Sequence, residues 1–246
     1  MKAFILAAGL GTRLKPWTLS HPKALVPVGG VPMLGRVIDN LKKQGFDDIS
    51  LNIHHFGSQI LDFIGEDPAL NNIKVSDESE CLLDTGGALL HALPLLGMTP
   101  DPVLVHNVDI LSDADLKNLF KFHVDSDADA TLLVSNRSSS RRLIFTPDMR
   151  LCGWHNLQTD EYKPAHFTPE AGAVELAFSG IYVISPSLIE KMSSFGFSGK
   201  FSIIDFFIAA CSNCKILGVR ADELNLIDIG KPETLSQAQL LYKNFL

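Results

Sequence analysis

Basic residues and glycines are concentrated at the start of the chain, with no acid among them. Residues 1–38 contain Lys2, Arg13, Lys15, Lys23 and Arg36, whereas the first carboxylate is Asp39. The chain as a whole is acidic, with a net charge of −7. One basic, glycine-bearing segment in an acidic protein predicts a local pocket for a small anion, and it argues against a nucleic-acid-binding surface.

The segment Leu6–Leu14 has the composition of a phosphate-binding loop. Gly9 and Gly11 allow successive backbone N–H groups to converge on an anion and let a phosphate approach the main chain. Thr12 adds a hydroxyl and Arg13 a planar donor. Glycines that serve only the geometry of a turn are the alternative for this segment taken alone.

Two better-known phosphate-binding patterns are absent. A dinucleotide-binding turn needs a third glycine at position 14, which is Leu, and an acid near the end of the second strand, where the residues are Asn52-Ile53-His54-His55. The Gly-Lys-Ser/Thr pattern of a phosphate loop does not occur either.

A second segment, Pro22–Val28, places Lys23 between prolines and apolar residues. This composition predicts a stiff, partly buried segment whose ammonium points into a cavity, with a solvated loop lysine as the alternative. Together, Leu-Ala-Ala-Gly-x-Gly-Thr-Arg-Leu-x-Pro and Pro-Lys-x-Leu-x-Pro-Val resemble the signature of the sugar-1-phosphate nucleotidyltransferases. Among short members, the chain most resembles N-acetylmuramate-1-phosphate uridylyltransferases and mannose- or heptose-1-phosphate guanylyltransferases.

Four later segments also resemble this family. Asp84–Ala88 resembles the glycine turn beside the nucleotide base, and Phe178–Tyr182 resembles the sugar-facing strand, in which Gly180 permits close approach of the ring. Asp109 and Asp228 match the two carboxylates of the magnesium site. Taken alone, Asp109 fits a helix cap and Asp228 a turn equally well.

The resemblance implies a reaction and a set of site residues. A sugar-1-phosphate oxygen attacks the α-phosphorus of a nucleoside triphosphate and releases pyrophosphate, so positioning and electrostatics supply the catalysis. Arg13 and Lys23 are the expected catalytic cations, and Asp109 and Asp228 the expected Mg²⁺ ligands. The expected nucleotide contacts are Ala8, Gly9, Gly11, Thr12, Thr85, Gly86 and Gly87, and Gly180 is the expected sugar contact.

The sequence departs from the family in one place and leaves the substrates open. Many relatives carry Glu-Lys-Pro after the strand that ends here at Trp154, but this chain has His155-Asn156-Leu157, and Lys163-Pro164 comes later. Glu78 and Glu80 fit either guanine recognition or solvated loop charges. The base, the sugar and the oligomeric state are not predicted. A glycosyltransferase or a catalytically silent sugar-nucleotide sensor is the alternative function.

Strand-length apolar runs alternate with segments of helical period, which predicts an α/β fold with a doubly wound, mostly parallel, Rossmann-like sheet. We expect a single domain over 1–246, with a nucleotide-binding half (1–125) and a sugar-binding half (126–246). Expected helices include one that Ser112 caps, one broken late by Pro94, and a last one over about 232–242.

The remaining sequence features concern the cellular location of the protein and the role of its cysteines. No apolar run approaches the ~20 residues of a membrane-spanning helix, and the apolar stretch Ala3–Ala8 is shorter than a secretory signal requires. We therefore expect a cytoplasmic protein without membrane partners. Cys211 and Cys214 form a lone CxxC, which we interpret as core cysteines.

Overall fold

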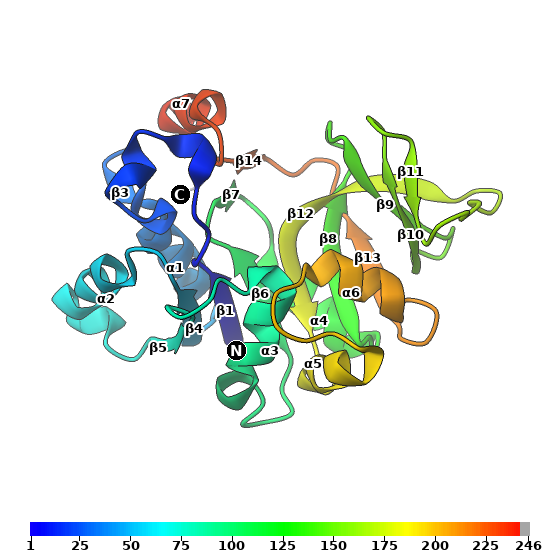
Figure 1. The fold of residues 1–246 in the computed structure, drawn as a ribbon, viewed down its shortest axis with the longest axis horizontal. Coiled ribbons are helices and arrows are strands. Elements are labelled where there is room, and N and C mark those ends of the chain that lie inside the picture. Colours follow the sequence, from blue (N-terminus) through cyan, green and yellow to red (C-terminus); the bar gives the residue numbers. More distant parts are fainter. Residues whose placement is uncertain (242–246) are drawn as a thin grey trace.

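A ten-stranded sheet runs through residues 1–241, the part of the chain that the computed structural model describes, with helices on both faces (Figure 1). The path of the sheet is β11-β10-β9-β12-β6-β1-β4-β5, and β8 joins it through β12 and carries β13. The predicted α/β, Rossmann-like fold is confirmed.

The first half of the chain contributes four mutually parallel strands. These are β1 (Lys2–Leu6), β4 (Asp48–Ile53), β5 (Lys74–Asp77) and β6 (Val103–Asn107). In the parallel pair of β1 and β6, Leu6 lies opposite Asn107. The loops that follow these two strands therefore leave the same edge of the sheet, where open α/β sheets bind ligands.

The second half joins the sheet mainly through antiparallel pairs. Its strands are β8 (Ala130–Ser135), β9 (Arg141–Phe145), β10 (Leu151–Asn156), β11 (Glu161–Lys163), β12 (Val174–Ile184) and β13 (Ile216–Arg220). The long strand β12 pairs antiparallel with β6, β8 and β9. One strand thus connects the two halves into a continuous sheet.

Two apolar cores lie on opposite faces of the sheet. One contains α1 (Met33–Lys43), α2 (Gly57–Glu66) and α4 (Leu116–Asp125), and the other contains α3 (Asp84–Leu96), α5 (Pro186–Lys191) and α6 (Ile203–Ala210). The amphipathic pattern of α1 follows from apolar residues that recur at helical spacing, so that Leu34, Val37, Ile38 and Leu41 are all buried.

Small elements complete the edge above β1. Three 3-10 turns (Thr12–Leu14, Trp17–Leu19 and Lys23–Leu25) and the short pair β2 (Pro27–Val28) and β3 (Val31–Pro32) replace the expected irregular loop. A second two-stranded sheet pairs β7 (Ile110–Ser112) with β14 (Leu226–Asp228). The last described helix is α7 (Pro232–Leu241), and Tyr242 of the expected helix lies outside the described residues.

Two of the expected helix signals are wrong. Ser112 lies in β7, and the side chain of Asp115 caps α4 by accepting from the N–H of Asn118 at 2.9 Å. Pro94 does not break α3, which runs through it and ends two residues later, at Leu96.

Candidate active site

A cleft of about 430 Å³ opens above the carboxyl ends of β1 and β6. Both halves of the chain line it. Its lining includes the predicted residues Ala8, Gly9, Gly11, Thr12, Arg13, Lys23, Thr85 and Asp109. It also includes Asn52, Asn107, Lys200 and Gly230, which were not among the expected site residues, and Glu78, for which guanine recognition and a solvated loop charge were both left open.

The phosphate-loop candidate is held by Asn52. Its side-chain oxygen Oδ1 accepts from the backbone N–H of Ala7 at 2.6 Å and of Ala8 at 3.2 Å. Gly11 adopts a left-handed conformation with φ of 59°, and a Cβ there would lie 2.8 Å from Cβ of Lys23. Gly11 is therefore required for the close approach of the two basic segments.

Lys23 and Asp109 form an ion pair in the cleft, with side chains that are 12% and 15% exposed. Lys23 belongs to a 3-10 turn of the second basic segment (Pro22–Val28), and Asp109 follows β6. The predicted partly buried lysine is therefore confirmed, and its first partner is the carboxylate assigned to the metal.

The strand pair β7–β14 places the backbone of Asp228 beside that of Asp109, although Asp228 is not among the residues that line the cleft; that the two acids share one site stays a prediction. Asp228 lies opposite Ile110, and the N–H of Ile229 donates to the carbonyl of Asp109 at 2.9 Å. The carboxylate of Asp228 accepts from the N–H of Gly230 at 2.7 Å. A Cβ on Gly230 would lie 2.6 Å from Nη2 of Arg13 and 2.7 Å from Oδ1 of Asp228, so these two groups flank the same glycine.

Residues Thr85–Gly87, in the first turn of α3, bind the second half of the chain. The N–H groups of Gly86 and Gly87 donate to the carbonyl of Phe201 at 2.9 and 3.3 Å, and the Thr85 hydroxyl accepts from the N–H of Ile203 at 3.0 Å. A Cβ on Gly87 would lie 2.1 Å from the carbonyl oxygen of Gly199. These glycines therefore have a structural task, and their predicted contact with a nucleotide stays a prediction.

Glu78 is buried at the cleft, whereas Glu80 is exposed. The carboxylate of Glu78 accepts from Nδ2 of Asn52 at 2.7 Å and from the N–H of Leu83 at 3.3 Å. Burial raises the pKa of Glu78, and these two hydrogen bonds oppose the rise. Interpreting both glutamates as solvated loop charges is thus wrong for Glu78.

Gly180 lies against the first half of the site. Its φ is 77°, and a Cβ there would lie 2.7 Å from Nδ2 of Asn107. The pairing of β12 with β8 shifts register between Phe178 and Tyr182. A glycine is thus required where β12 packs against Asn107; Gly180 is not among the residues that line the cleft, and its contact with a sugar stays a prediction.

Two lysines of the second half differ in their surroundings. Lys163 donates to Oδ1 of Asp205 at 2.9 Å and lies 4.9 Å above the ring of Trp154, so its charge is already partnered. Lys200 lines the cleft and forms no hydrogen bond or ion pair within residues 1–241. Its neighbours Gly199 and Phe201 contact the Thr85–Gly87 turn, Gly199 by close packing and Phe201 by hydrogen bonds. Local sequence patterns do not predict this long-range contact.

The CxxC pair fits the interpretation as core cysteines, since Cys214 is buried and Cys211 half-buried, whereas Cys81 is exposed. All four cysteines are free, and burial raises the pKa of Cys152 to about 11 and raises the pKa values of Cys211 and Cys214. Within residues 1–241 no group of three or more His, Cys, Asp or Glu side chains is arranged to hold a metal. In the same range no helix has the length and apolar character to cross a membrane.

The sequence profile of the family described as "Nucleotidyl transferase" matches residues 2–244. The chain belongs to this family. An N-acetylmuramate alpha-1-phosphate uridylyltransferase of Neisseria meningitidis is 36% identical to this nucleotidyl transferase over 196 residues, which cover 79% of each chain. A mannose-1-phosphate guanylyltransferase of Arabidopsis thaliana is 30% identical over 78% of this chain, which spans only 52% of that relative.

Solved structures agree with this assignment of the nucleotidyl transferase. HddC of Yersinia pseudotuberculosis, solved with GMP-PN, has a TM-score of 0.75 and 25% identity, and the match covers 98% of this chain and 99% of that one. A candidate glucose-1-phosphate thymidylyltransferase of Bacillus anthracis has a TM-score of 0.81 at 19% identity and covers 100% and 96% of the two chains. The latter likeness concerns the fold.

Proposed function

We propose that this nucleotidyl transferase joins a nucleoside triphosphate to a sugar 1-phosphate, forming a nucleoside-diphosphate sugar and releasing pyrophosphate. The observation that carries the proposal is the charge arrangement of the cleft. Arg13, Lys23 and Lys200 converge there from both halves of the chain, next to Asp109. Two polyanionic substrates need cations from both sides before they can meet.

The reaction needs no nucleophile from the protein. A phosphate oxygen of the sugar 1-phosphate is already an anion; it forms a bond to the α-phosphorus, and pyrophosphate leaves with the electron pair of the broken P–O bond. Backbone N–H groups around Gly9–Thr12 bind the phosphates. Arg13 stabilises the leaving pyrophosphate, and Lys23 stabilises the α-phosphate and the incoming phosphate.

We assign Asp109 and Asp228 as Mg²⁺ ligands. The residues fit this ion, because Mg²⁺ in phosphate-transfer sites binds one or two carboxylates and takes its remaining ligands from phosphates and water. The strand pair β7–β14 places the two acids on neighbouring backbone positions, and within residues 1–241 no third His, Cys, Asp or Glu completes a cluster with them. When bound, the ion supplies positive charge to the phosphate oxygens. Lys23 occupies one oxygen of Asp109 and leaves the other for a ligand role.

The relatives name the substrates to test first. The Neisseria protein is named for uridylyl transfer to N-acetylmuramate 1-phosphate, and the Arabidopsis protein for guanylyl transfer to mannose 1-phosphate. We propose UTP and GTP as the candidate donors and both sugars as candidate acceptors. We also propose that the enzyme is cytoplasmic.

The experiment is a grid of four nucleoside triphosphates against several sugar 1-phosphates, assayed by pyrophosphate release. We expect one donor and one sugar class to dominate, with activity lost in EDTA and restored by excess Mg²⁺. Lys15→Ala is the matched control for Arg13→Ala, because Lys15 lies two residues away and does not line the cleft. Full activity in metal-free buffer would contradict the metal assignment, and sugar transfer from a nucleotide sugar without pyrophosphate chemistry would indicate a glycosyltransferase.

A further inference from the structure

The side chains of Asn52 and Glu78 connect the phosphate-loop candidate to the start of α3. Oδ1 of Asn52 accepts from the backbone N–H of Ala7 at 2.6 Å and of Ala8 at 3.2 Å. Nδ2 of Asn52 donates to Oε1 of Glu78 at 2.7 Å, and Oε2 of Glu78 accepts from the N–H of Leu83 at 3.3 Å. Because Asn52 and Glu78 are only 2% and 3% exposed, water competes little for these hydrogen bonds.

The hydrogen-bonding partners determine which way round the Asn52 amide lies. The two backbone N–H groups beyond β1 can only donate, so they require the amide oxygen on their side. The amide nitrogen must then face an acceptor, which the Glu78 carboxylate supplies. Glu78 therefore orients Asn52, and Asn52 in turn supplies the acceptor for two buried backbone donors of the loop.

This chain of hydrogen bonds lies at the cleft and reaches the other half of the protein. Asn52 and Glu78 both line the cleft. The carbonyl of Leu83 accepts from the N–H of Phe201 at 3.1 Å, and Phe201 follows Lys200 in the sequence. The position of the phosphate-loop candidate relative to α3 thus depends on two polar side chains that belong to neither element.

We propose that Asn52 and Glu78 are positioning residues for nucleotidyl transfer, which hold the phosphate loop in the conformation that binds the triphosphate. The inference rests on the proposed function for the identity of the ligand. Neither side chain has to touch a phosphate, since a displacement of ~1 Å remote from the reacting atoms can slow an enzyme roughly 100-fold. Direct recognition of the base by the Glu78 carboxylate is the competing role.

The test reverses the direction of the hydrogen bond between the two side chains. Glu78→Gln leaves two N–H donors for one remaining oxygen, and Asn52→Asp places two carboxylates against each other. The double variant Asn52→Asp/Glu78→Gln satisfies every partner again. Its carboxylate at position 52 accepts from Ala7, from Ala8 and from the amide at position 78, whose oxygen accepts from Leu83. The double variant also keeps the net charge of the wild type.

Two measurements follow the loop. One is calorimetric binding of UTP and GTP, and the other is hydrogen exchange of the backbone amides of residues 7–11 in protein without substrate. Each single variant should weaken triphosphate binding and accelerate exchange roughly 10-fold, as expected for a buried donor left unpaired. The double variant should return both values to within about threefold of wild type, because all of the hydrogen bonds are restored.

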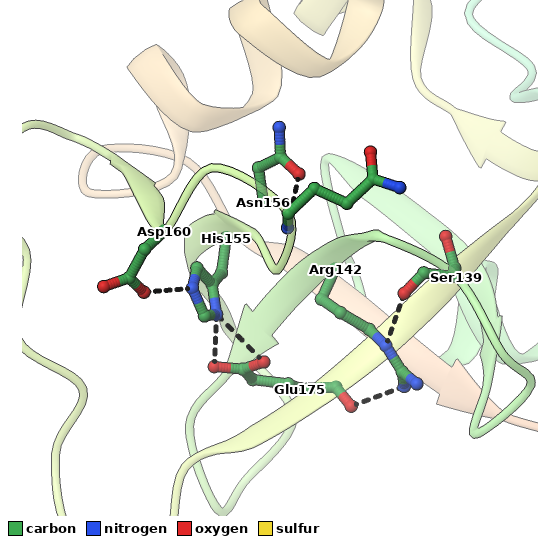
Figure 2. A network of polar contacts seen from close by, with 7 residues as sticks. Ser139, Arg142, His155, Asn156, Asp160 and Glu175 are labelled. Carbon is green, nitrogen blue, oxygen red and sulfur yellow. Dashed lines mark hydrogen bonds and ion pairs between the residues drawn. The ribbon is translucent and has the colours of Figure 1, made fainter.

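Two substitutions are matched controls. Ser50→Ala removes another buried hydrogen bond between β4 and β1, from Oγ to the carbonyl of Ala3 at 3.4 Å, at a position that does not line the cleft. Glu175→Gln makes the same change of charge in a separate polar network, where Figure 2 shows the Glu175 carboxylate directed to Nδ1 of His155 at 3.1 and 3.2 Å. Both controls should leave triphosphate binding and loop exchange unchanged, whatever their effect on overall stability.

Normal binding and exchange in both single variants would overturn the inference, and so would exchange in the double variant as fast as in the single ones. Restored exchange without restored binding in the double variant would assign the Glu78 carboxylate to direct contact with the base, which also overturns it. If the wild type binds neither UTP nor GTP, the proposed function fails. Exchange in the substrate-free protein then still decides whether Asn52 and Glu78 hold the loop.

Discussion

The ammonium of Lys23 donates to a carboxylate oxygen of Asp109 across 86 residues of chain. Both side chains are largely buried, so the cation is fixed before a substrate arrives and needs little reorganisation during the reaction. The same pair balances the charge of Asp109, the carboxylate that we assign to Mg²⁺. One ion pair thus connects the phosphate-binding segment with the proposed metal site.

Removal of the basic side chain of either segment, Arg13 or Lys23, should slow turnover. We expect Arg13→Ala and Lys23→Ala to reduce kcat well over tenfold, because each loses several times ~1.4 kcal/mol of charge stabilisation. Lys23→Arg should not restore activity, since a planar fork replaces a compact ammonium at a tightly packed position. Steady-state kinetics at matched unfolding temperatures check this, and a near-normal kcat in either alanine variant would remove that residue from the mechanism.

Asp228→Asn tests the proposed metal site through charge, since it keeps size and turn propensity. We expect a higher Mg²⁺ requirement and a much lower kcat, with nearly unchanged thermal stability. The double variant with Asp109→Asn should be little worse than the poorer single variant, because groups that act as a unit are not additive. Multiplicative losses would show that the two acids have separate tasks.

Gly87→Ala tests the contact between the glycine turn and the second half. The added Cβ would lie 2.1 Å from the carbonyl oxygen of Gly199, and backbone cannot move away as easily as a side chain. We expect the free energy of unfolding to fall by about 1–3 kcal/mol, as for overpacked sites. Urea denaturation measures this. Gly65→Ala is the control, because Gly65 lies in α2 with open space around its Cα; equal stability of the two variants would contradict the packing argument.

Two buried histidines predict a loss of stability in acid. Burial lowers the pKa values of His106 and His123 to about 4, below the ordinary value of 6.5. The unfolded chain then binds more protons than the native chain between these pH values, so stability is complete above pH 6.5 and decreases toward pH 4, by at most roughly 3 kcal/mol per histidine. His123→Gln should remove its share of this slope in urea titrations, and exposed His55→Gln should leave the slope unchanged.

Local patterns predicted most of the sheet and the two basic segments. Apolar runs of strand length bounded by turn residues are typical of buried strands. Such runs predicted β1, β4, β6, β8 and β12. The strands β11 and β14 were missed; each has three residues, and β14 is partly exposed, so neither produces a clear apolar run. Ser112 resembled a helix cap in the local sequence. It is a strand residue because β7 pairs with the distant strand β14, which local sequence does not show.

The missed parts of the site depend on contacts between distant residues. Asn52 holds the phosphate-loop candidate and Glu78 together, yet in sequence it is one polar residue of a buried strand. Lys200 reaches the cleft because the Thr85–Gly87 turn binds the segment around it. A resemblance to family motifs located the glycines of that turn, but not the packing that makes them necessary.

An ¹⁸O-labelling experiment is the strongest test of direct attack by the sugar phosphate on the nucleoside triphosphate. A sugar 1-phosphate with ¹⁸O in its three terminal phosphate oxygens is incubated with unlabelled nucleoside triphosphate and Mg²⁺, and the products are weighed by mass spectrometry. Attack of the sugar phosphate on the α-phosphorus predicts that all of the label enters the nucleoside-diphosphate sugar and that pyrophosphate stays unlabelled. Label in free phosphate or in pyrophosphate would contradict this mechanism.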